Sequence, residues 1–240
     1  MERILILYDN RSHRETLRPG WGFSALIERG GNVVLFDVGA DVLVFKHNAK
    51  ACGVDPKATD ALVLSHEHCD HIGAISAALH RELDVYYPAS FSSRFEKEIW
   101  DEGRKPSWAP RPVTDPVEIA PGIHSTGELK GKSGIVEQGV IVEAGEGPIL
   151  ITGCAHPGIV QMVEVATDAV GRCPHLVLGG FHLFRKKAAE VQAIAEQLKQ
   201  LGVKEIAPCH CTGERATTVL CEAFTDASTG IGVGTEIPIR

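Results

Sequence analysis

The densest group of reactive side chains lies at positions 66–71, with the sequence HEHCDH. If the first three residues are extended, His66 and His68 point to the same side, because side chains alternate along a strand. A turn after them can bring Asp70 and His71 back toward the same space. Three imidazoles and one carboxylate are donors that suit zinc, iron or manganese. The segment therefore predicts a metal site.

Three later segments share one design, in which a short apolar run ends in Gly or Pro and a histidine follows. They are ILITGCAHPG, HLVLGGFHL and EIAPCHCTG, and they contain His156, His182 and His210. Each histidine is expected at the end of a strand, just before a helix. Together with the first segment, they predict metal ligands that converge on one edge of a sandwich of sheets.

Cysteines accompany two of these histidines. Cys154 lies two positions before His156, so the two side chains can share a face, and a thiolate there would favour zinc. The alternative is a buried thiol that only packs. Cys209 and Cys211 flank His210 and would point to the opposite side of an extended chain, so both are expected to pack in the core.

A basic turn follows His182. Arg185 and Lys186 lie at an expected helix start, where the helix dipole and the two cations attract anions. They are therefore candidate residues for binding a substrate phosphate, and Lys130 and Lys132 could add to the charge. A solvated basic turn is the alternative.

The segments that must position these residues alternate between strand and helix patterns in both halves of the chain. Gly30-Gly31 predicts the turn of a hairpin. Apolar runs predict strands at 3–8, 23–28, 33–37, 61–64, 84–87, 117–123, 139–144, 148–152, 175–178 and 205–208. Helices are expected at 41–52, 74–81, 157–170 and 187–201, and Thr212 is expected to cap a further one. This pattern favours an α/β fold in which two sheets pack together and helices flank them.

Prolines dominate the segment 100–116, which contains four of them. Such a density disfavours regular structure, so a long loop is expected, either a lid or a surface excursion. Trp100 and Trp108 lie on it and could stack on a heteroaromatic ring.

Composition narrows the class of protein. The 240 residues are 44% hydrophobic and 23% charged, which is ordinary for one globular domain over residues 1–240. The net charge of -7 disfavours general binding of nucleic acid or of an anionic membrane. No apolar run approaches the roughly 18 residues that cross a bilayer. An odd number of cysteines, seven, and a start without signal-peptide character predict reduced thiols in the cytoplasm.

The pattern at positions 66–71, read as HxHxDH after a hydrophobic strand, resembles the signature of the metallo-β-lactamase superfamily. LFDVG at 35–39 resembles that superfamily's strand-ending Asp-x-Gly. Asp9-Asn10, the WGFS of 21–24, GCAHPG, GGFHL and PCHCTG look most like a subgroup labelled 7,8-dihydropterin-6-methyl-4-(β-D-ribofuranosyl)aminobenzene 5′-phosphate synthase-like. The resemblance covers the whole chain. It implies an αββα four-layer sandwich with a dinuclear site at one edge, for two zinc ions, or for manganese or iron.

The chain departs from the superfamily pattern at the bridging aspartate. That residue usually follows an apolar strand as Thr-Gly-Asp, whereas here Thr152-Gly153 precedes Cys154. His156 is then expected to supply the third nitrogen of one metal. The ligand sets that the resemblance implies are His66, His68 and His156 at one metal, and Asp70, His71 and either His182 or His210 at the other.

These expectations predict a metal-dependent hydrolase in which a metal-bound hydroxide attacks an ester, a phosphoester or a related small molecule. Asp70 would bind metal and also orient the nucleophile. The alternatives are a synthase or transferase acting on a pterin or ribose-phosphate precursor, a di-iron redox protein, and a binding module without turnover. A Cys154 thiolate that closes the coordination sphere would favour the last of these.

Overall fold

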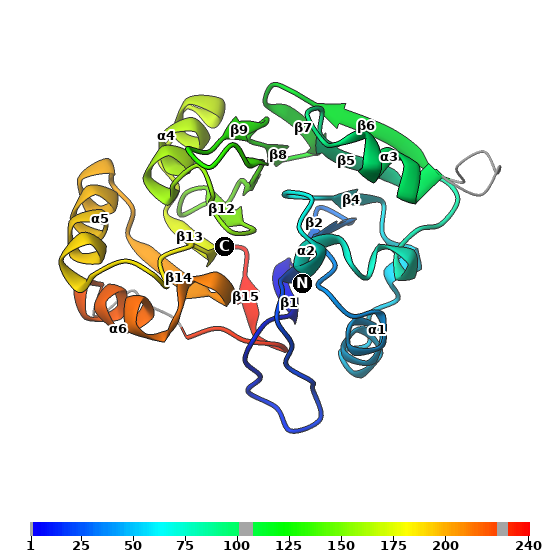
Figure 1. Cartoon of the computed structure of the whole chain (residues 1–240), viewed down its shortest axis with the longest axis horizontal. Helices are drawn as coiled ribbons and strands as arrows, with labels where there is room; N and C mark the ends of the chain where they lie inside the picture. The colour runs from blue at the N-terminus through cyan, green and yellow to red at the C-terminus, as the bar shows by residue number, and fades with distance from the viewer. Residues whose placement is uncertain (1, 101–107, 225–229) are drawn as a thin grey trace.

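Two β-sheets pack face to face in the centre of the molecule, and helices cover both outer faces (Figure 1). This computed structural model describes residues 2–100, 108–224 and 230–240, without the side chains of residues 96 and 98–100. The first sheet has the order β15-β1-β2-β3-β4-β5-β6. Its strands are β1 (Arg3–Tyr8), β2 (Ser24–Arg29), β3 (Asn32–Phe36), β4 (Ala61–Val63), β5 (Asp84–Pro88), β6 (Ala109–Val113) and β15 (Glu236–Pro238).

The second sheet has the order β14-β13-β12-β11-β8-β7. Its strands are β7 (Val117–Ala120), β8 (Ile123–Ser125), β11 (Val140–Val142), β12 (Ile149–Thr152), β13 (Leu176–Gly180) and β14 (Glu205–Cys209). A separate hairpin is formed by β9 (Leu129–Lys130) and β10 (Val136–Glu137). Strands β3 to β6 are parallel, as are β12 to β14, so the carboxyl ends within each set lie at one edge.

The helices form the two outer layers. The first sheet is covered by α1 (Val42–Ala51) and α3 (Ser93–Trp100), and the second by α4 (Ile159–Val170), α5 (Ala188–Leu201) and α6 (Glu214–Ala223). The short helix α2 (Cys69–Ile72) follows the loop after β4. Most of the expected elements are confirmed to within a few residues, and so is the αββα sandwich.

Alternating side chains explain how each sheet holds both of its neighbours. In β1, Ile4 and Ile6 pack between the sheets, whereas Leu5 and Leu7 pack beneath helix α1. In β12, Ile149 and Ile151 face the first sheet, and Leu150 faces α4. Because both faces are covered, these strands are apolar along their whole length.

Three expected elements differ from the structure. The helix expected at 74–81 is only a short 3₁₀ turn, Ile75–Ala77. The strand expected at 117–123 is divided into β7 and β8 at Pro121-Gly122, where Gly122 has φ 71. Thr212 does not cap α6: its Oγ1 accepts the N–H of Phe181, 3.0 Å away.

The expectation of a loop throughout 100–116 is wrong for residues 109–113. They form β6, which pairs with β5 although it contains Pro110 and Pro112. The N–H of Ala109 points toward β5 and donates to the Leu83 carbonyl, 2.7 Å away. Because backbone N–H directions alternate along a strand, the nitrogens of Pro110 and Pro112 point away from β5, toward the open edge of the sheet. An edge strand loses no ladder hydrogen bond there. Residues 101–107 lie outside the described residues, so the expectation of a lid is not tested.

Of the two tryptophans in this segment, the structure describes the side chain of Trp108 and not that of Trp100. Trp108 is 6% exposed and packs in the core beneath the first sheet, so the expectation that it stacks on a ligand is wrong. The side chain of Trp100 lies outside the described residues. In the part of the chain that is described, no helix combines the length and the apolar character needed to cross a membrane.

Candidate metal centre

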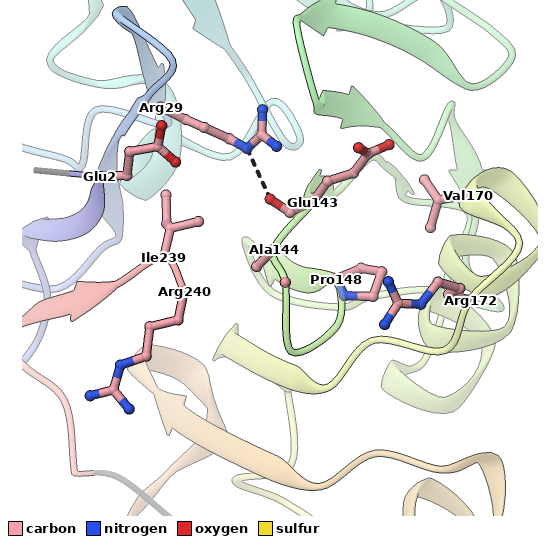
Figure 2. Close-up of a pocket in the computed structure, with 10 residues that line it drawn as sticks. Glu2, Arg29, Glu143, Ala144, Pro148, Val170, Arg172, Ile239 and Arg240 are labelled. Atoms are coloured by element: carbon pink, nitrogen blue, oxygen red, sulfur yellow. Dashed lines mark hydrogen bonds between the residues drawn. The ribbon is translucent and has the colours of Figure 1, made fainter.

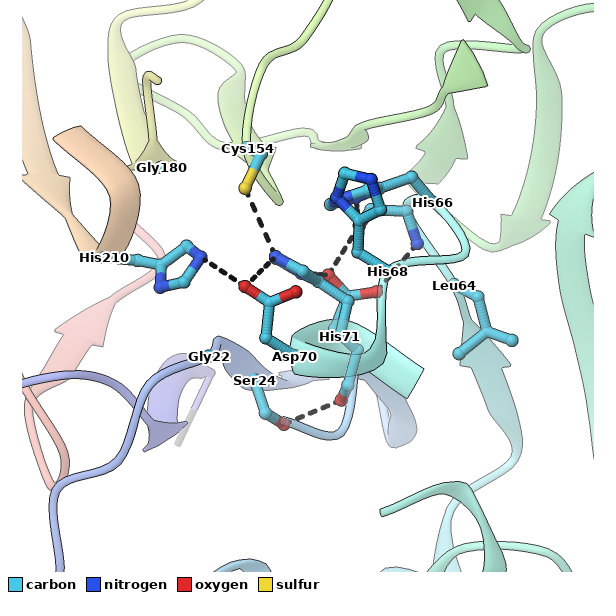
Figure 3. Close-up of polar contacts among 12 residues, drawn as sticks. Gly22, Ser24, Leu64, His66, His68, Asp70, His71, Cys154, Gly180 and His210 are labelled. Carbon is cyan, nitrogen blue, oxygen red and sulfur yellow. Dashed lines mark hydrogen bonds and ion pairs between the residues drawn. The ribbon is translucent and has the colours of Figure 1, made fainter. Parts of the chain in front are cut away.

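The predicted ligands follow strands of both sheets. Figure 3 shows six of them close together: His66, His68, Asp70, His71, Cys154 and His210. The segment from His66 to His71 follows β4 of the first sheet. In the second sheet, His156, His182 and His210 follow β12, β13 and β14. The parallel direction of these strands brings the three later histidines to one edge, as the repeated design predicts.

One group consists of His66, His68 and His156. Their ring centroids lie 4.6, 4.8 and 5.0 Å apart, and His66 Nε2 lies 3.0 Å from His68 Nδ1. Burial lowers the pKa of His66 well below its usual value. Burial and the neighbouring His182 and His68 lower the pKa of His156 to about 3. These imidazoles are therefore neutral at physiological pH, the form that binds metal.

A second group consists of Asp70, His71 and His210. Asp70 Oδ2 lies 3.4 Å from His210 Nε2 and 3.9 Å from His71 Nε2. Burial favours the neutral acid, but the contact with His210 and the charge of His71 hold the pKa of Asp70 below its usual value. Of the two histidines left open for this group, His210 is therefore the one beside Asp70.

Cys154 lies between the two groups. Its Sγ is 3.3 Å from His71 Nε2 (Figure 3). Its ligand atom lies within 4.8 Å of those of His66 and His156, and equally within 4.8 Å of those of His71 and His210. The Cys154 sulfur is thus adjacent to both groups.

Cys211 joins the site although it was expected to pack in the core beside Cys209. Its Sγ groups with Cys154 and His182 within 4.8 Å. The assumption of an extended chain fails because His210 has φ 46 and begins a 3₁₀ turn, which redirects the next side chain. Contact with Cys211 raises the pKa of His182. Cys209 remains in the core between the sheets.

Asp37 orients His71 from the end of β3. Its Oδ2 lies 2.6 Å from His71 Nδ1, and it also accepts the N–H and the hydroxyl of Ser65, each 2.7 Å away. Burial alone would lower the pKa of His71, but the charge and the hydrogen bond of Asp37 raise it to about 9. The Nδ1 proton is thus held by Asp37, and Nε2 faces Cys154. The LFDVG segment was the sequence signal for this residue.

Two residues after β1 hold His210. Asn10 Nδ2 donates to the His210 carbonyl, 3.1 Å away, and Asn10 Oδ1 lies 3.1 Å from His210 Nδ1. Asp9 Oδ2 accepts the N–H of His210, 3.0 Å away. The pair fixes His210 so that its Nε2 faces Asp70. The sequence analysis identified Asp9 and Asn10 only as part of the motifs that resemble the subgroup.

Glu137 is a residue that the sequence analysis missed. It is fully buried, and its carboxylate accepts the backbone N–H groups of Cys154, Ala155 and His156, each at 2.8 Å. Burial raises the pKa of Glu137 to about 7, although the three N–H donors favour the charged form. The carboxylate holds the loop that carries Cys154 and His156.

Backbone strain is concentrated at the same place. Among the described residues, five that are not glycine have positive φ, and Asp37, Ala155, His182 and His210 are four of them. Such conformations persist only where surrounding contacts enforce them, and they cluster at functional sites.

Two buried nitrogens test whether these residues fit metal ions. His156 Nε2 and His210 Nε2 are buried and make no hydrogen bond within the part of the chain that the structure describes. The Asp70 carboxylate lies 3.4 Å from His210 Nε2 as an ion pair, and a buried imidazole nitrogen that makes no hydrogen bond is costly in a protein interior. Both belong to the groups around Cys154, so they have the position and the chemistry of metal ligands.

The residues predicted to bind an anion are exposed at the protein surface. Arg185 is exposed, and its guanidinium lies 5.2 Å from the centroid of the Phe184 ring. Lys186 Nζ lies 3.5 Å from Glu190, whose carboxylate also accepts the N–H of Lys187 at the start of α5. The chain's own carboxylate therefore occupies this helix N-terminus. Lys130 and Lys132 are exposed on the β9–β10 hairpin.

A pocket of about 360 Å³ lies near the opposite ends of the strands (Figure 2). Residues around it include Arg29 at the end of β2, Pro148 before β12 and Arg172 after α4. The described residues that line it include no histidine or cysteine, so it lacks the ligands that gather at the other edge.

The model of the metallo-beta-lactamase superfamily matches residues 17–210. The chain belongs to the metallo-β-lactamase superfamily. A 7,8-dihydropterin-6-methyl-4-(beta-D-ribofuranosyl)-aminobenzene-5'-phosphate synthase of Methanocaldococcus jannaschii is 30% identical to it, over 87% of each chain. The uncharacterized protein MJ0448 of the same organism is 27% identical, over 91% of this chain and 94% of its own.

The fold of this metallo-β-lactamase superfamily member is also found in solved structures. The crystal structure of Tm1679, a metal-dependent hydrolase of the beta-lactamase superfamily, matches it with a TM-score of 0.80 and 25% identity. The match covers 100% of this chain and 99% of the other. The family and the subgroup expected from the motifs are thus confirmed, and the chain is a metal-dependent enzyme of the hydrolase type found in this superfamily.

Proposed function

We propose that this hydrolase has a dinuclear centre and cleaves an ester, a phosphoester or a related bond in a small molecule. The observation that carries the proposal is the position of Cys154, whose sulfur is shared by the His66–His156 group and the His71–His210 group. The shared thiolate would replace the bridging aspartate. A centre that holds only one ion would leave one of the groups without a role.

The donor set favours zinc, since imidazole and thiolate are its preferred protein ligands, with manganese or iron as alternatives. His66, His68 and His156 would hold one ion, and Asp70, His71 and His210 the other, with Cys154 between them. Metal ions bound there would act as Lewis acids and would make a nucleophilic water available at neutral pH. His182 and Cys211 lie beside the first group and could complete its coordination.

Besides binding metal, Asp70 is proposed to orient the attacking water. Its carboxylate stays ionised because its pKa is lowered, and it is only partly exposed at the centre. It can therefore accept a hydrogen bond from the attacking water and orient it. Asp37 holds the Nδ1 proton of His71, so a metal ion would take the place of the proton on Nε2.

Arg185 is the proposed contact for a substrate phosphate. Substitution of Arg185 by alanine should raise KM for a phosphorylated substrate severalfold and leave kcat unchanged, because ground-state and transition-state binding are lost equally. Lys186→Ala is the matched control, and its smaller effect is expected because Lys186 already pairs with Glu190. An unchanged KM for Arg185→Ala would remove this residue from the proposal.

The proposal is tested by elemental analysis of the purified protein, without added metal. We expect about two ions per wild-type chain, as in other two-metal hydrolases, and the loss of one of them in Cys154→Ala. Cys173→Ala is the control, because Cys173 lies outside the centre and contacts the carbonyl of Pro174. One ion or fewer in the wild type after metal is added back would contradict a dinuclear centre.

A synthase or transferase activity on a pterin or ribose-phosphate precursor is the second candidate. It is favoured by the 30% identity to a relative with a synthase name. Reaction in ¹⁸O-labelled water distinguishes the two, because only hydrolysis incorporates the label into product. That the substrate is a small molecule and not a nucleic acid, and that the protein is cytoplasmic, remain predictions from charge and cysteine content.

A further inference from the structure

Two exposed aromatic side chains flank the proposed metal centre. Among the described residues, the large apolar side chains that stay exposed are Trp21 (58%), Leu43 (74%), Val117 (39%) and Phe184 (45%). The two aromatic ones, Trp21 and Phe184, line the same pocket of about 300 Å³, together with His210. We call this pair the aromatic rim. Exposed aromatic surface that gathers at a pocket is a mark of ligand binding.

Each ring of the aromatic rim contacts a histidine of the centre. The centroid of Trp21 lies 5.1 Å from that of His210. The centroid of Phe184 lies 5.3 Å from that of His182, edge to face. A ligand held at the rim would therefore lie beside the proposed metal ligands, at the distance of one side chain.

The backbone of the aromatic rim is fixed on both sides. A Cβ at Gly22 would lie 2.4 Å from the carbonyl oxygen of Asp70, so the chain next to Trp21 packs directly on α2. A Cβ at Gly213 would lie 2.7 Å from the Cβ of Phe184, so the start of α6 packs directly against the backbone of this residue. Both rings are exposed on an ordered backbone, which lowers the entropy lost when a ligand binds.

The pocket is lined by acidic and basic side chains, and two guanidinium groups, those of Arg11 and Arg185, lie at or beside it. Asp9 and Asn10 line it, but both are occupied in holding His210. Arg11 and Glu214 also line it and form an ion pair at 3.3 Å, in which the two side chains are 48% and 89% exposed. Such an exposed pair is weak and can yield to a ligand. Arg185 stacks on Phe184 and adds a second guanidinium at the rim.

We infer that the aromatic rim binds a planar aromatic group of the substrate, and that the anionic substituent of this group lies near Arg11 or Arg185. This inference names a substrate class for the proposed hydrolase and so rests on that proposal. It also replaces Trp108, which is buried, with two aromatic residues whose rings are exposed. Aromatic stacking tolerates many ring systems, so the rim selects for planarity and charge.

The test measures binding with a probe that has no bond to hydrolyse. Pterin-6-carboxylate, a planar bicyclic anion, is titrated into the purified protein by calorimetry, and cyclohexanecarboxylate serves as the non-planar anion. We expect the first to bind and the second not to bind. Trp21→Ala and Phe184→Ala should each weaken binding about tenfold or more, the usual loss for one stacking partner. Trp21→Phe should retain most of the affinity, because it retains a ring.

Leu43→Ala is the control, since Leu43 is an exposed apolar side chain on α1, outside the pocket. It should bind the probe as the wild type does. The inference is overturned if pterin-6-carboxylate does not bind, if it binds no better than cyclohexanecarboxylate, or if Trp21→Ala and Phe184→Ala bind it unchanged. Because the readout needs no turnover, a protein that binds the probe but hydrolyses nothing would contradict the proposed function alone.

Discussion

At the scale of single residues, the centre depends on groups that aim the ligands as much as on the ligands. Ser65 donates its hydroxyl to Asp37 and lies 2.9 Å from His66 Nδ1. Asp37 holds His71 in the same way, and Asn10 holds His210. In each case the outer ring nitrogen is engaged, which leaves Nε2 directed at the centre. Such partners fix the tautomer and the orientation of a metal-binding histidine.

Asp37→Asn tests this orientation. The amide of asparagine would offer an N–H to His71 Nδ1, which would move the ring proton to Nε2 and block that atom as a ligand. We expect metal affinity to fall by about 10- to 100-fold at the site that contains His71. Competition with a fluorescent chelator measures the loss. Asp41→Asn, which changes a carboxylate at the start of α1, should leave the affinity unchanged.

The same pair predicts a pH dependence in chelated, metal-free protein. The pKa of His71 is raised to about 9 from an ordinary value of 6.5, so its ion pair with Asp37 stabilises the folded state fully below pH 6.5. This contribution is lost as the pH rises toward and through 9. Urea unfolding at pH 6.5, 7.5 and 9 should show a free-energy gap between wild type and Asp37→Asn that narrows with pH. Parallel curves would contradict the assignment.

At the scale of elements, the loop between β12 and α4 is held by one side chain from β10. Glu137 accepts three consecutive N–H groups, which is how a loop with the strained Ala155 can present both Cys154 and His156. A Cβ at Gly153 would lie 2.2 Å from Ser65 Oγ, so this loop also packs directly against the end of β4. The two sheets therefore meet closely at the centre.

Glu137→Gln should loosen this loop. Glutamine can still accept the N–H groups of Cys154 and Ala155, but its amide would face the N–H of His156 as a second donor. A buried donor without a partner costs about 1–3 kcal/mol of unfolding free energy. Because burial raises the pKa of Glu137 from an ordinary value of 4.5 to about 7, the wild type loses stability as the pH rises through this range, whereas glutamine does not titrate. The loss caused by Glu137→Gln should therefore be larger at pH 6 than at pH 8.5.

Urea unfolding at these two pH values measures the effect of Glu137→Gln. Glu143→Gln is its control, because Glu143 is exposed and pairs with His124 at the surface. We expect that control to change stability by less than about 1 kcal/mol. An equal loss of unfolding free energy at both pH values would contradict the raised pKa of Glu137.

At the scale of the whole molecule, the proposed ligands come from both sheets. His66 to His71 follow β4 of the first sheet, and Cys154 to His210 follow strands of the second. Metal bound between them would join the two halves of the sandwich, in addition to the apolar side chains that pack between the sheets. Metal removal should therefore destabilise the entire fold.

Calorimetry with and without chelator measures this contribution. A ligand present at 100 times its dissociation constant stabilises the folded state by about 2.7 kcal/mol, so Tm should fall on chelation and recover when metal is restored. In Cys154→Ala the fall should be smaller, since fewer ions are bound. An unchanged Tm on complete metal removal would show that the centre does not couple the sheets.

The sequence by itself determined the family, the sandwich and the candidate ligands. Strand patterns are local, because alternation and apolar runs follow from which faces are buried, and the HxHxDH spacing places its donors within one turn of chain. That residues 1–240 form one domain also remains a prediction from the sequence. The repeated strand–Gly–His design predicted one common edge, since the carboxyl ends of parallel strands meet there.

Only the tertiary structure decided which residues face each other across that edge. Glu137, Asp37 and Asn10 reach their partners over long stretches of chain, and no local pattern encodes such contacts. The positive φ of His210 turned Cys211 toward Cys154, against the alternation of an extended chain. Likewise, proline could enter β6 because that strand lies at the edge of its sheet. The physical reason is common to these cases: burial and backbone direction at one residue are fixed by elements that are distant in sequence.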